Sequence, residues 1–174
     1  AIQGGVLAGD EVHKAILERD FSPQRFANYA RFMREGIENM RKLVYATSLS
    51  LDGYIDASAG DPSWVVPDEE LHRHFNDIER EIDTQLYGRR MYELMAGYGP
   101  TADQDPSAPD VILEYAQIWK PIPKVVFSST LESVDWNSLL VRGDAVTEVA
   151  RLKAQPGRAM GVGGLTLASS LASA

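Results

Sequence analysis

The sequence predicts an α/β fold with a mainly parallel β-sheet that is covered by helices on both faces. The first observation is that short apolar stretches alternate with amphipathic ones from about Arg41 onward, as strands and helices alternate in such folds. The second is that glycine or hydroxyl residues follow three of these apolar stretches and precede a helix, as they do at the carboxyl ends of parallel strands. The composition agrees, because the 174 residues are 44% apolar and 24% charged, which is typical of a globular domain.

The pattern of apolar residues in residues 1–39 differs from that of the rest. It predicts a helical hairpin, separate from a domain over residues 40–174. An apolar stripe near the start suggests the first helix. Ser22 and Pro23 predict the start of the second helix, with Ser22 as N-cap and Pro23 at the first helical position. Apolar residues then recur at steps of three and four, which predicts one apolar face on that helix. These residues are Phe26, Tyr29, Ala30, Met33 and Ile37.

The remaining elements follow from the alternation of apolar and polar residues. Strands are expected at residues 43–46, 84–87, 124–127, 134–141 and 160–162. Helices are expected at residues 68–82, 89–95, 110–119, 144–154 and 165–172. The helix at 68–82 opens with Pro67 and three acidic residues, which suit the positive end of a helix dipole. Long loops are expected at 48–61 and 97–109, where glycine, proline and aspartate gather.

Charge and composition exclude several classes of function. A formal net charge of -8 argues against nucleic acid as a partner. The chain has no cysteine, which rules out disulfides and thiolate metal sites. His72 and His74 are two residues apart, a spacing that directs them away from each other on a helix, so no metal site is expected. No apolar run is long enough for a bilayer and the start lacks signal-peptide features, so a cytoplasmic location without a membrane partner is expected.

Three segments place glycine, arginine or hydroxyl residues between a strand and a helix, where α/β folds bind phosphates. They are Gly88-Arg89-Arg90, Ser128-Ser129-Thr130 and Gly163-Gly164-Leu165-Thr166. Each segment also has a structural interpretation. The first can be a glycine turn with solvated arginines, the second a set of hydroxyls that cap the next turn, and the third a tight turn without the Rossmann fingerprint. Taken singly, each segment is more often structural than functional.

A fourth segment places Trp64 and Glu69 at the start of the helix expected at 68–82. A half-buried carboxylate in this place is suited to donate a proton or to anchor the N–H edge of a ligand. The alternative is that these are ordinary acidic residues at a helix N-terminus, with no ligand nearby.

The order of these segments resembles the dihydrofolate reductase superfamily, in particular bacterial proteins related to the reductase domain of riboflavin biosynthesis (RibD C-terminal domain-like). The ordered segments are a strand, Ser48-Leu49-Ser50-Leu51-Asp52-Gly53-Tyr54-Ile55, Trp64 to Glu69, Gly88-Arg89-Arg90, Phe127-Ser128-Ser129 and Val162-Gly163-Gly164. The resemblance covers about residues 40–174. It implies a mixed, mainly parallel sheet. It also implies an NAD(P)H-dependent oxidoreductase that transfers hydride to a C=N or C=O bond of a small pterin- or pyrimidine-like substrate.

The resemblance also implies roles for individual residues. Ala46, Asp52 and Gly53 would border the nicotinamide, with Asp52 and Glu69 as the catalytic candidates and Trp64 and Glu69 as substrate contacts. The other implied positions bind the dinucleotide. Gly88, Arg89 and Arg90 would bind its phosphates, Ser128 and Ser129 would lie near the adenosine ribose and its 2′-phosphate, and Gly163, Gly164, Leu165 and Thr166 would hold the diphosphate. NADPH is the expected cofactor, with NADH as the alternative because this family often has arginine where Ser129 stands.

Departures from the family pattern leave alternatives open. The stretch from Lys120 to Lys124 has no arginine, whereas dihydrofolate reductases place one there for the folate tail. The resemblance further implies that the sheet stops before its last strands, so we expect an edge strand that invites a second copy, and hence a homo-oligomer. A dinucleotide-binding module without turnover and an inactive fragment are the alternatives. Residues 1–39 loosely resemble the tail of the FAD domain of flavin-dependent monooxygenases and halogenases, without implying FAD binding.

Overall fold

The computed structural model describes residues 22, 24, 41–55, 67–105 and 107–173. The chain divides into two compact units, Ala1–Met40 and Arg41–Ala174. The helical hairpin expected for residues 1–39 therefore lies outside the described residues, apart from Ser22 and Gln24. Trp64 lies outside them as well.

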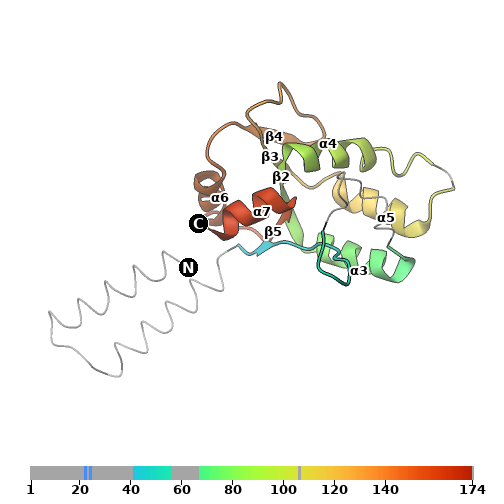
Figure 1. Ribbon diagram of the computed structural model, residues 1–174, viewed down its shortest axis with the longest axis horizontal. Helices are drawn as coiled ribbons and strands as arrows, with labels where there is room; N and C mark the ends of the chain where they lie inside the picture. Colours follow the sequence, from blue (N-terminus) through green and yellow to red (C-terminus); the bar gives the residue numbers. More distant parts are fainter. Residues whose placement is uncertain (1–21, 23, 25–40, 56–66, 106, 174) are drawn as a thin grey trace. The chain divides into compact units, whose positions relative to one another are not determined.

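The second unit contains a sheet of five parallel strands in the order β1-β5-β2-β3-β4 (Figure 1). The strands are β1 (Leu43–Val44), β2 (Ile82–Gly88), β3 (Lys124–Phe127), β4 (Ser138–Val141) and β5 (Ala159–Gly163). All four pairs of described strands are parallel. The late strand β5 lies between β1 and β2, so the order in the sheet differs from the order in the chain.

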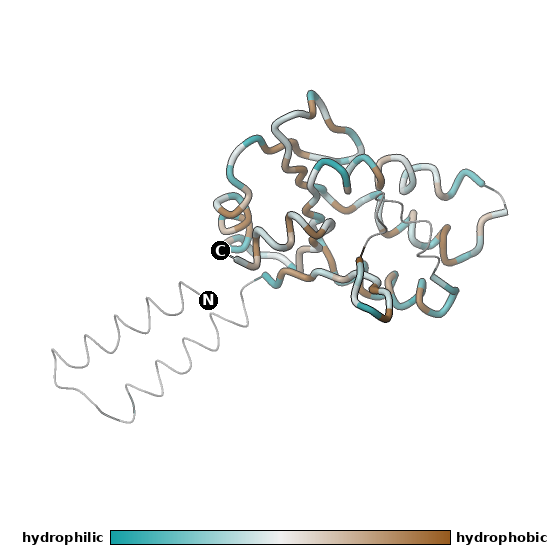
Figure 2. The backbone as a smooth tube through the Cα atoms, viewed as in Figure 1, coloured by the Kyte–Doolittle hydropathy of each residue, from teal (hydrophilic) through white to brown (hydrophobic). Residues whose placement is uncertain are grey.

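Helices cover both faces of this sheet, as the sequence predicts. They are α3 (Glu69–Arg80), α4 (Arg89–Tyr98), α5 (Asp110–Trp119), α6 (Ala145–Lys153) and α7 (Leu165–Ala172). Neighbouring residues of a strand point to opposite faces. Leu86 accordingly packs in a cluster with Val149 of α6 and Leu167 of α7, while Tyr87 packs with Trp119 of α5 on the other face. Hydrophobic residues concentrate along the central strands, and the tube turns hydrophilic where α4 begins (Figure 2).

The helices begin in two different ways. The carboxylates of Asp68 and Asp144 cap α3 and α6, because they accept hydrogen bonds from the backbone N–H of Leu71 and of Thr147. In contrast, α4 and α7 begin after Gly88 and Gly164, and neither helix has a side-chain cap. The first N–H groups of α4 and α7 therefore lack the side-chain acceptor that stabilises α3 and α6. The remaining helix, α5, begins after Pro109 and has no side-chain cap either.

Several boundaries expected from the sequence are wrong by a few residues. The first strand ends at Val44 rather than residue 46. The helix expected at 68–82 ends at Arg80, because buried Ile82 already belongs to β2. The strand expected at 134–141 starts only at Ser138. Trp136 and Asn137 have φ angles of 57° and 56°, and this left-handed conformation cannot continue a strand.

A network of charged groups joins the amino ends of β1, β2 and β5. The buried guanidinium of Arg41 donates to the Arg158 carbonyl at 2.9 Å, to the Thr84 hydroxyl at 2.9 Å and to the Asp83 carboxylate. The same carboxylate accepts from the backbone N–H of Arg158 at 2.6 Å. Gly157 is tightly enclosed, since a Cβ added there would lie 2.6 Å from Nε of Arg41. The network ties three strands together at the edge opposite the segments discussed next.

Candidate functional site

The three segments that suggested phosphate binding lie at one edge of the sheet. In the parallel register, Gly88 pairs with Phe127 of β3 and Tyr87 pairs with Gly163 of β5. The carboxyl ends of three adjacent strands therefore carry Gly88, the Ser128 turn and Gly163 side by side. This is the edge at which parallel α/β sheets bind ligands, and the expectation that the three turns share one edge is confirmed.

Two glycines open the helices that start at this edge. A Cβ added to Gly88 would meet no atom within 4 Å, so the backbone before α4 is open to close approach. Gly164 has a φ of 98°, a conformation that side-chain-bearing residues rarely adopt. The N-termini of α4 and α7 thus present backbone N–H groups and the positive ends of two helix dipoles to the same edge, which suits an anion.

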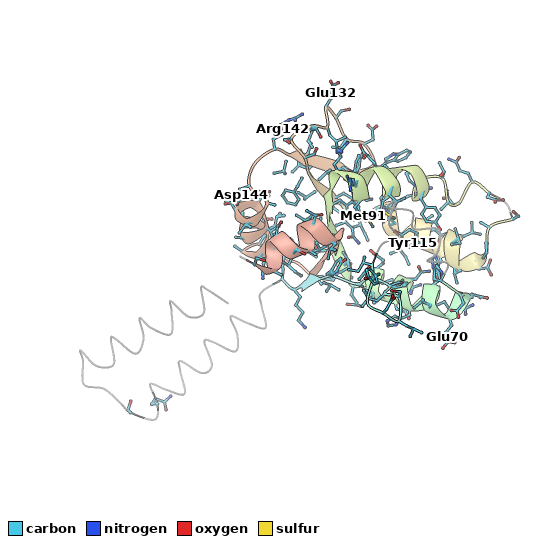
Figure 3. The ribbon with its side chains drawn as sticks, in the orientation of Figure 1. Glu70, Met91, Tyr115, Glu132, Arg142 and Asp144 are labelled. Carbon is cyan, nitrogen blue, oxygen red and sulfur yellow. The ribbon has the colours of Figure 1, made fainter. Side chains whose placement is uncertain are left out.

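A third glycine at this edge, Gly163, is explained by close packing. A Cβ on Gly163 would lie 2.6 Å from the ring of Tyr87 and 2.8 Å from Cγ of Met91. Tyr87 cannot easily give way, since it is buried and its hydroxyl accepts a hydrogen bond from Nε1 of Trp119 at 2.9 Å. Met91, in the first turn of α4, lies on the side of that helix toward α7 (Figure 3). Gly163 therefore allows β2, β5 and α4 to approach one another, independently of any ligand.

The first turn of α4 carries two exposed arginines. The guanidinium of Arg89 has one carboxylate neighbour, Glu93, at the long distance of 3.6 Å. Arg90 forms no ion pair with a residue in the described part of the chain. Leu165 and Thr166, in the first turn of α7, are exposed as well. The roles of these four residues in binding a dinucleotide stay predictions.

Arg142 adds a cation that the sequence reasoning missed. It follows β4, and its guanidinium donates to the Ser129 carbonyl at 3.1 Å and to the Leu131 carbonyl at 2.6 Å. It lies beside the loop after β3 (Figure 3), at the same edge as Arg89. Its signal in the sequence was its place directly after a strand, the place that drew attention to Gly88 and Ser128.

The Ser128 hydroxyl caps the turn that follows β3, which was the structural alternative to phosphate binding. Its Oγ accepts from the backbone N–H of Thr130 at 3.2 Å and of Leu131 at 3.1 Å, so it caps the turn after β3. Ser129 is exposed. Of these two serines, Ser129 is the one whose side chain remains available to a ligand.

The candidate catalytic carboxylates differ from the half-buried group expected. The side chain of Glu69 is 61% exposed and pairs with Arg73 one turn later in α3, so its expected half-buried environment is wrong. Asp52 is exposed and accepts a 2.6 Å hydrogen bond from the Ser50 hydroxyl. It lies in a tight turn that Gly53 closes with a φ of 85°. Ala46 is exposed at the start of the same loop.

Beneath the site, the sheet face toward α5 holds ionisable groups that serve the fold. Nζ of Lys124 donates to the carbonyls of Trp119 at 2.7 Å and of Lys120 at 3.2 Å, and lies 3.6 Å from the Trp119 ring centre. Burial lowers the pKa of Lys124 to about 8, against the opposing effect of nearby Glu79. Burial raises the pKa of Glu79, whose carboxylate accepts from Gln85. Each of these two groups therefore has hydrogen-bond partners within the fold.

The described residues contain neither a membrane-spanning helix nor a cluster of metal ligands. No helix among them has the length and apolar character needed to cross a membrane. The same residues contain no group of three or more histidine, aspartate or glutamate side chains that could hold a metal ion.

Comparisons with known proteins agree with this architecture. The model of the RibD C-terminal domain family matches residues 41–174. The chain is 30% identical over 121 residues to the uncharacterized protein YyaP of Bacillus subtilis (strain 168), covering 68% of this chain and 60% of YyaP. It also resembles the crystal structure of a diaminohydroxyphosphoribosylaminopyrimidine deaminase/5-amino-6-(5-phosphoribosylamino)uracil reductase from Thermotoga maritima, with a TM-score of 0.51 at 15% identity. That match covers 82% of this chain and 44% of the other. The expected dihydrofolate-reductase-like fold is confirmed.

Proposed function

Because the chain belongs to the RibD C-terminal domain family, we propose that it is an NAD(P)H-dependent reductase. It transfers a hydride to a C=N or C=O bond of a small heteroaromatic molecule of the pterin or pyrimidine kind. The observation that carries the proposal is the shared edge of β2, β3 and β5. At this edge, α4 and α7 start without side-chain caps, and the arginines beside them have no close carboxylate partner.

The proposed nucleotide site uses this edge in a defined way. The N–H groups at the start of α4 and α7 bind the diphosphate together with Arg89 and Arg90, because charge-assisted hydrogen bonds to phosphate are the strong ones. Gly88, Gly163 and Gly164 let the backbone approach the diphosphate, with Leu165 and Thr166 in the first turn of α7 beside it. Bound NADPH supplies the hydride, and the protein orients the two reactants.

The substrate end of the proposed site lies toward the loop of Ala46, Asp52 and Gly53 and toward the start of α3. Glu69 and Asp52 are the carboxyl groups available to hold or deliver a proton to the substrate. Both are exposed in the described structure. A catalytic role would therefore require the bound substrate to exclude water from one of them.

Arg142 supports NADPH rather than NADH as the preferred cofactor. Its guanidinium is held beside Ser129 by two backbone carbonyls, at the place where the adenosine 2′-phosphate is expected. It offers positive charge although position 129 itself carries serine. A guanidinium is suited to a phosphate because it presents several donors in one plane.

The experiment is a titration of the purified chain with NADPH and with NADH, followed by a hydride-transfer assay. We expect tighter binding of NADPH, and a loss of that preference in Arg142→Ala while NADH affinity stays unchanged. Binding of neither nucleotide would refute the proposal. Binding without oxidation of NADPH in the presence of any pterin or pyrimidine acceptor would favour the alternative of a dinucleotide-binding module without turnover.

A further inference from the structure

The connection between β3 and β4 contains no regular secondary structure. Parallel strands are usually joined by a crossover with an α-helix, because the chain has to return along the length of the sheet. β3 and β4 are parallel, but residues 128–137, which connect them, form neither a helix nor a strand. This segment, the β3–β4 crossover, has no internal ladder of backbone hydrogen bonds, so contacts with its neighbours must fix its conformation.

The β3–β4 crossover carries the groups that are proposed to contact the 2′-phosphate. Ser129 is exposed near its start. The carbonyls of Ser129 and Leu131 accept hydrogen bonds from the Arg142 guanidinium at 3.1 and 2.6 Å. The conformation of the crossover backbone therefore determines where this positive charge lies.

Polar side chains hold the two ends of the crossover. At its start, the Ser128 hydroxyl accepts hydrogen bonds from two backbone N–H groups of the crossover itself. At its end, the Asn137 side chain donates to the Pro121 carbonyl at 2.9 Å, and the Asn137 carbonyl accepts from the backbone N–H of Lys124 at 2.9 Å. These contacts fix the crossover to itself and to the chain around the start of β3, but not to α4.

Tyr92 connects the crossover to α4. Its hydroxyl accepts a 2.7 Å hydrogen bond from the backbone N–H of Asp135. The Tyr92 side chain is 7% exposed and belongs to the buried cluster against which Leu131 and Val134 of the crossover pack. Because the ring is enclosed, its hydroxyl is an acceptor in a fixed position, and it holds the crossover backbone at a defined distance from the helix.

The same helix carries the proposed contacts to the diphosphate. Arg89 and Arg90 precede Tyr92 in α4 by less than one turn. A dinucleotide with a 2′-phosphate presents two anionic groups at a fixed separation, one for the start of α4 and one for Ser129 and Arg142. The hydrogen bond between Tyr92 and Asp135 links the two parts of the protein that would bind these two groups.

We infer that Tyr92 is a positioning residue for cofactor selectivity. Its hydroxyl fixes the β3–β4 crossover so that Ser129 and Arg142 meet the 2′-phosphate while the start of α4 holds the diphosphate. The inference rests on the proposed function and assigns the preference for NADPH, within that function, to a buried side chain. NADH lacks the 2′-phosphate, so its affinity is independent of this hydroxyl.

The test removes the hydroxyl and keeps the ring. In Tyr92→Phe the N–H of Asp135 loses its acceptor, so the crossover is no longer held at α4. Calorimetry on the full chain measures the affinities for NADPH and NADH. We expect NADPH to bind about fivefold more weakly, the effect of one hydrogen bond, and NADH to bind as before.

Tyr87→Phe is the matched control for the loss of a buried hydroxyl. Tyr87 belongs to the same cluster as Tyr92, but its hydroxyl bonds to Trp119 rather than to the crossover. We expect this variant to keep the parent preference for NADPH over NADH. Equal losses of that preference in Tyr87→Phe and Tyr92→Phe would overturn the inference, because they would show a general effect of the core.

A double-mutant cycle tests whether Tyr92 acts through Arg142. In an Arg142→Ala background, Tyr92→Phe should weaken NADPH binding by less than about twofold, since the group that it positions is absent. In an Arg89→Ala background the full effect of about fivefold should remain, because Arg89 belongs to the diphosphate contacts. The same loss in both backgrounds would overturn the inference, and a mere loss of stability would not produce the difference that we expect.

Amide hydrogen exchange tests the hydrogen bond in the parent chain without any substitution. We expect the Asp135 amide to be protected, and protection to fall in Tyr92→Phe. An Asp135 amide that exchanges as fast as the exposed amide of Ser129 would overturn the inference. A parent chain that binds neither nucleotide refutes the proposed function and the inference with it. A parent preference for NADPH that persists in Tyr92→Phe refutes the inference alone.

Discussion

At the amino ends of β1, β2 and β5, charged groups satisfy one another, whereas at the carboxyl ends of β2, β3 and β5 they stay exposed. Arg41 is 6% exposed and donates to two side chains of β2 and to the carbonyl of Arg158, the residue before β5. Arg89 is half-exposed and has only a distant carboxylate. Both residues are arginines, so the residue type alone does not show whether a side chain stabilises the fold or binds a ligand. An arginine whose charge is neutralised by a close carboxylate of the chain holds the fold, and one without a close carboxylate is available to an anionic ligand.

The largest effect should come from the amino ends. Arg41→Ala leaves the partly buried Asp83 without its charged partner, so we expect the free energy of unfolding to fall by about 3–5 kcal/mol. Urea denaturation measures it. Arg151→Ala is the control, because its exposed pair with Glu148 should contribute less than about 1 kcal/mol. Equal losses in the two variants would show that the Arg41–Asp83 pair contributes no more stability than a surface ion pair.

Lys124, at the amino end of β3, is another buried charged group that is engaged by the fold. Its pKa is lowered from 10.5 to about 8 in the folded chain. Between these values the unfolded chain holds the proton and the folded chain does not, so stability should rise with pH from about 8 to 10. Above pH 10 the raised pKa values of Tyr87 and Tyr115 act in the opposite direction. Urea denaturation at several pH values should show the rise, and Lys124→Met should abolish it.

At the carboxyl ends, a charge removal should weaken ligand binding and leave stability unchanged. We expect Arg89→Ala to weaken the binding of NADPH by roughly 1.5–3 kcal/mol, the value of one charge-assisted phosphate contact. Its melting temperature should match that of the parent chain. Arg151→Ala again serves as the control for loss of a surface charge. Identical NADPH affinities for the two variants would make Arg89 a solvated surface residue.

Gly163 lies at the ligand-binding edge but serves the fold, because packing alone explains its lack of a side chain. Gly163→Ala forces a methyl group against the Tyr87 ring, and such overpacking costs about 1–3 kcal/mol of stability. Gly88→Ala provides the contrast, since a Cβ there meets no atom within 4 Å. Thermal melting should therefore separate the two variants. If both variants melt like the parent chain, Tyr87 is more mobile than its hydrogen bond to Trp119 indicates.

The smallest effect concerns the capped helices. Asp144→Ala removes the side-chain cap of α6, which should cost about 1 kcal/mol of stability. It should leave NADPH binding unchanged, because α6 is capped by its own aspartate rather than by a ligand. A marked loss of NADPH affinity in this variant would indicate that Asp144 belongs to the site.

Much of the fold could be predicted because its signals are local. The bounds of β3, α5 and α7 agree with the sequence-based expectation, since proline or glycine precedes each of these elements. The glycines of the site were also found in this way. The insertion of β5 between β1 and β2 could not be derived from the pattern, because strand order depends on contacts between distant segments.

Other features of the site depend on neighbours that the sequence does not reveal. Glu69 was expected to be half-buried, but Arg73 draws its carboxylate into an exposed pair on the surface of α3. The engagement of Lys124 with the end of α5 was likewise not foreseen. Arg142 was missed because its relevance comes from the Ser129 carbonyl, thirteen positions earlier in the chain.

The position of β5 has a consequence for biosynthesis. Arg41 and Arg158, which meet at the amino ends of the strands, are 117 positions apart in sequence. Strands β1 and β2 therefore leave the ribosome well before the strand that must pair between them. Until β5 emerges, the edges of β1 and β2 are unsatisfied and available for wrong pairing. Such distant contacts also slow folding, so we expect the sheet of the nascent chain to stay incomplete until β5 has emerged from the ribosome.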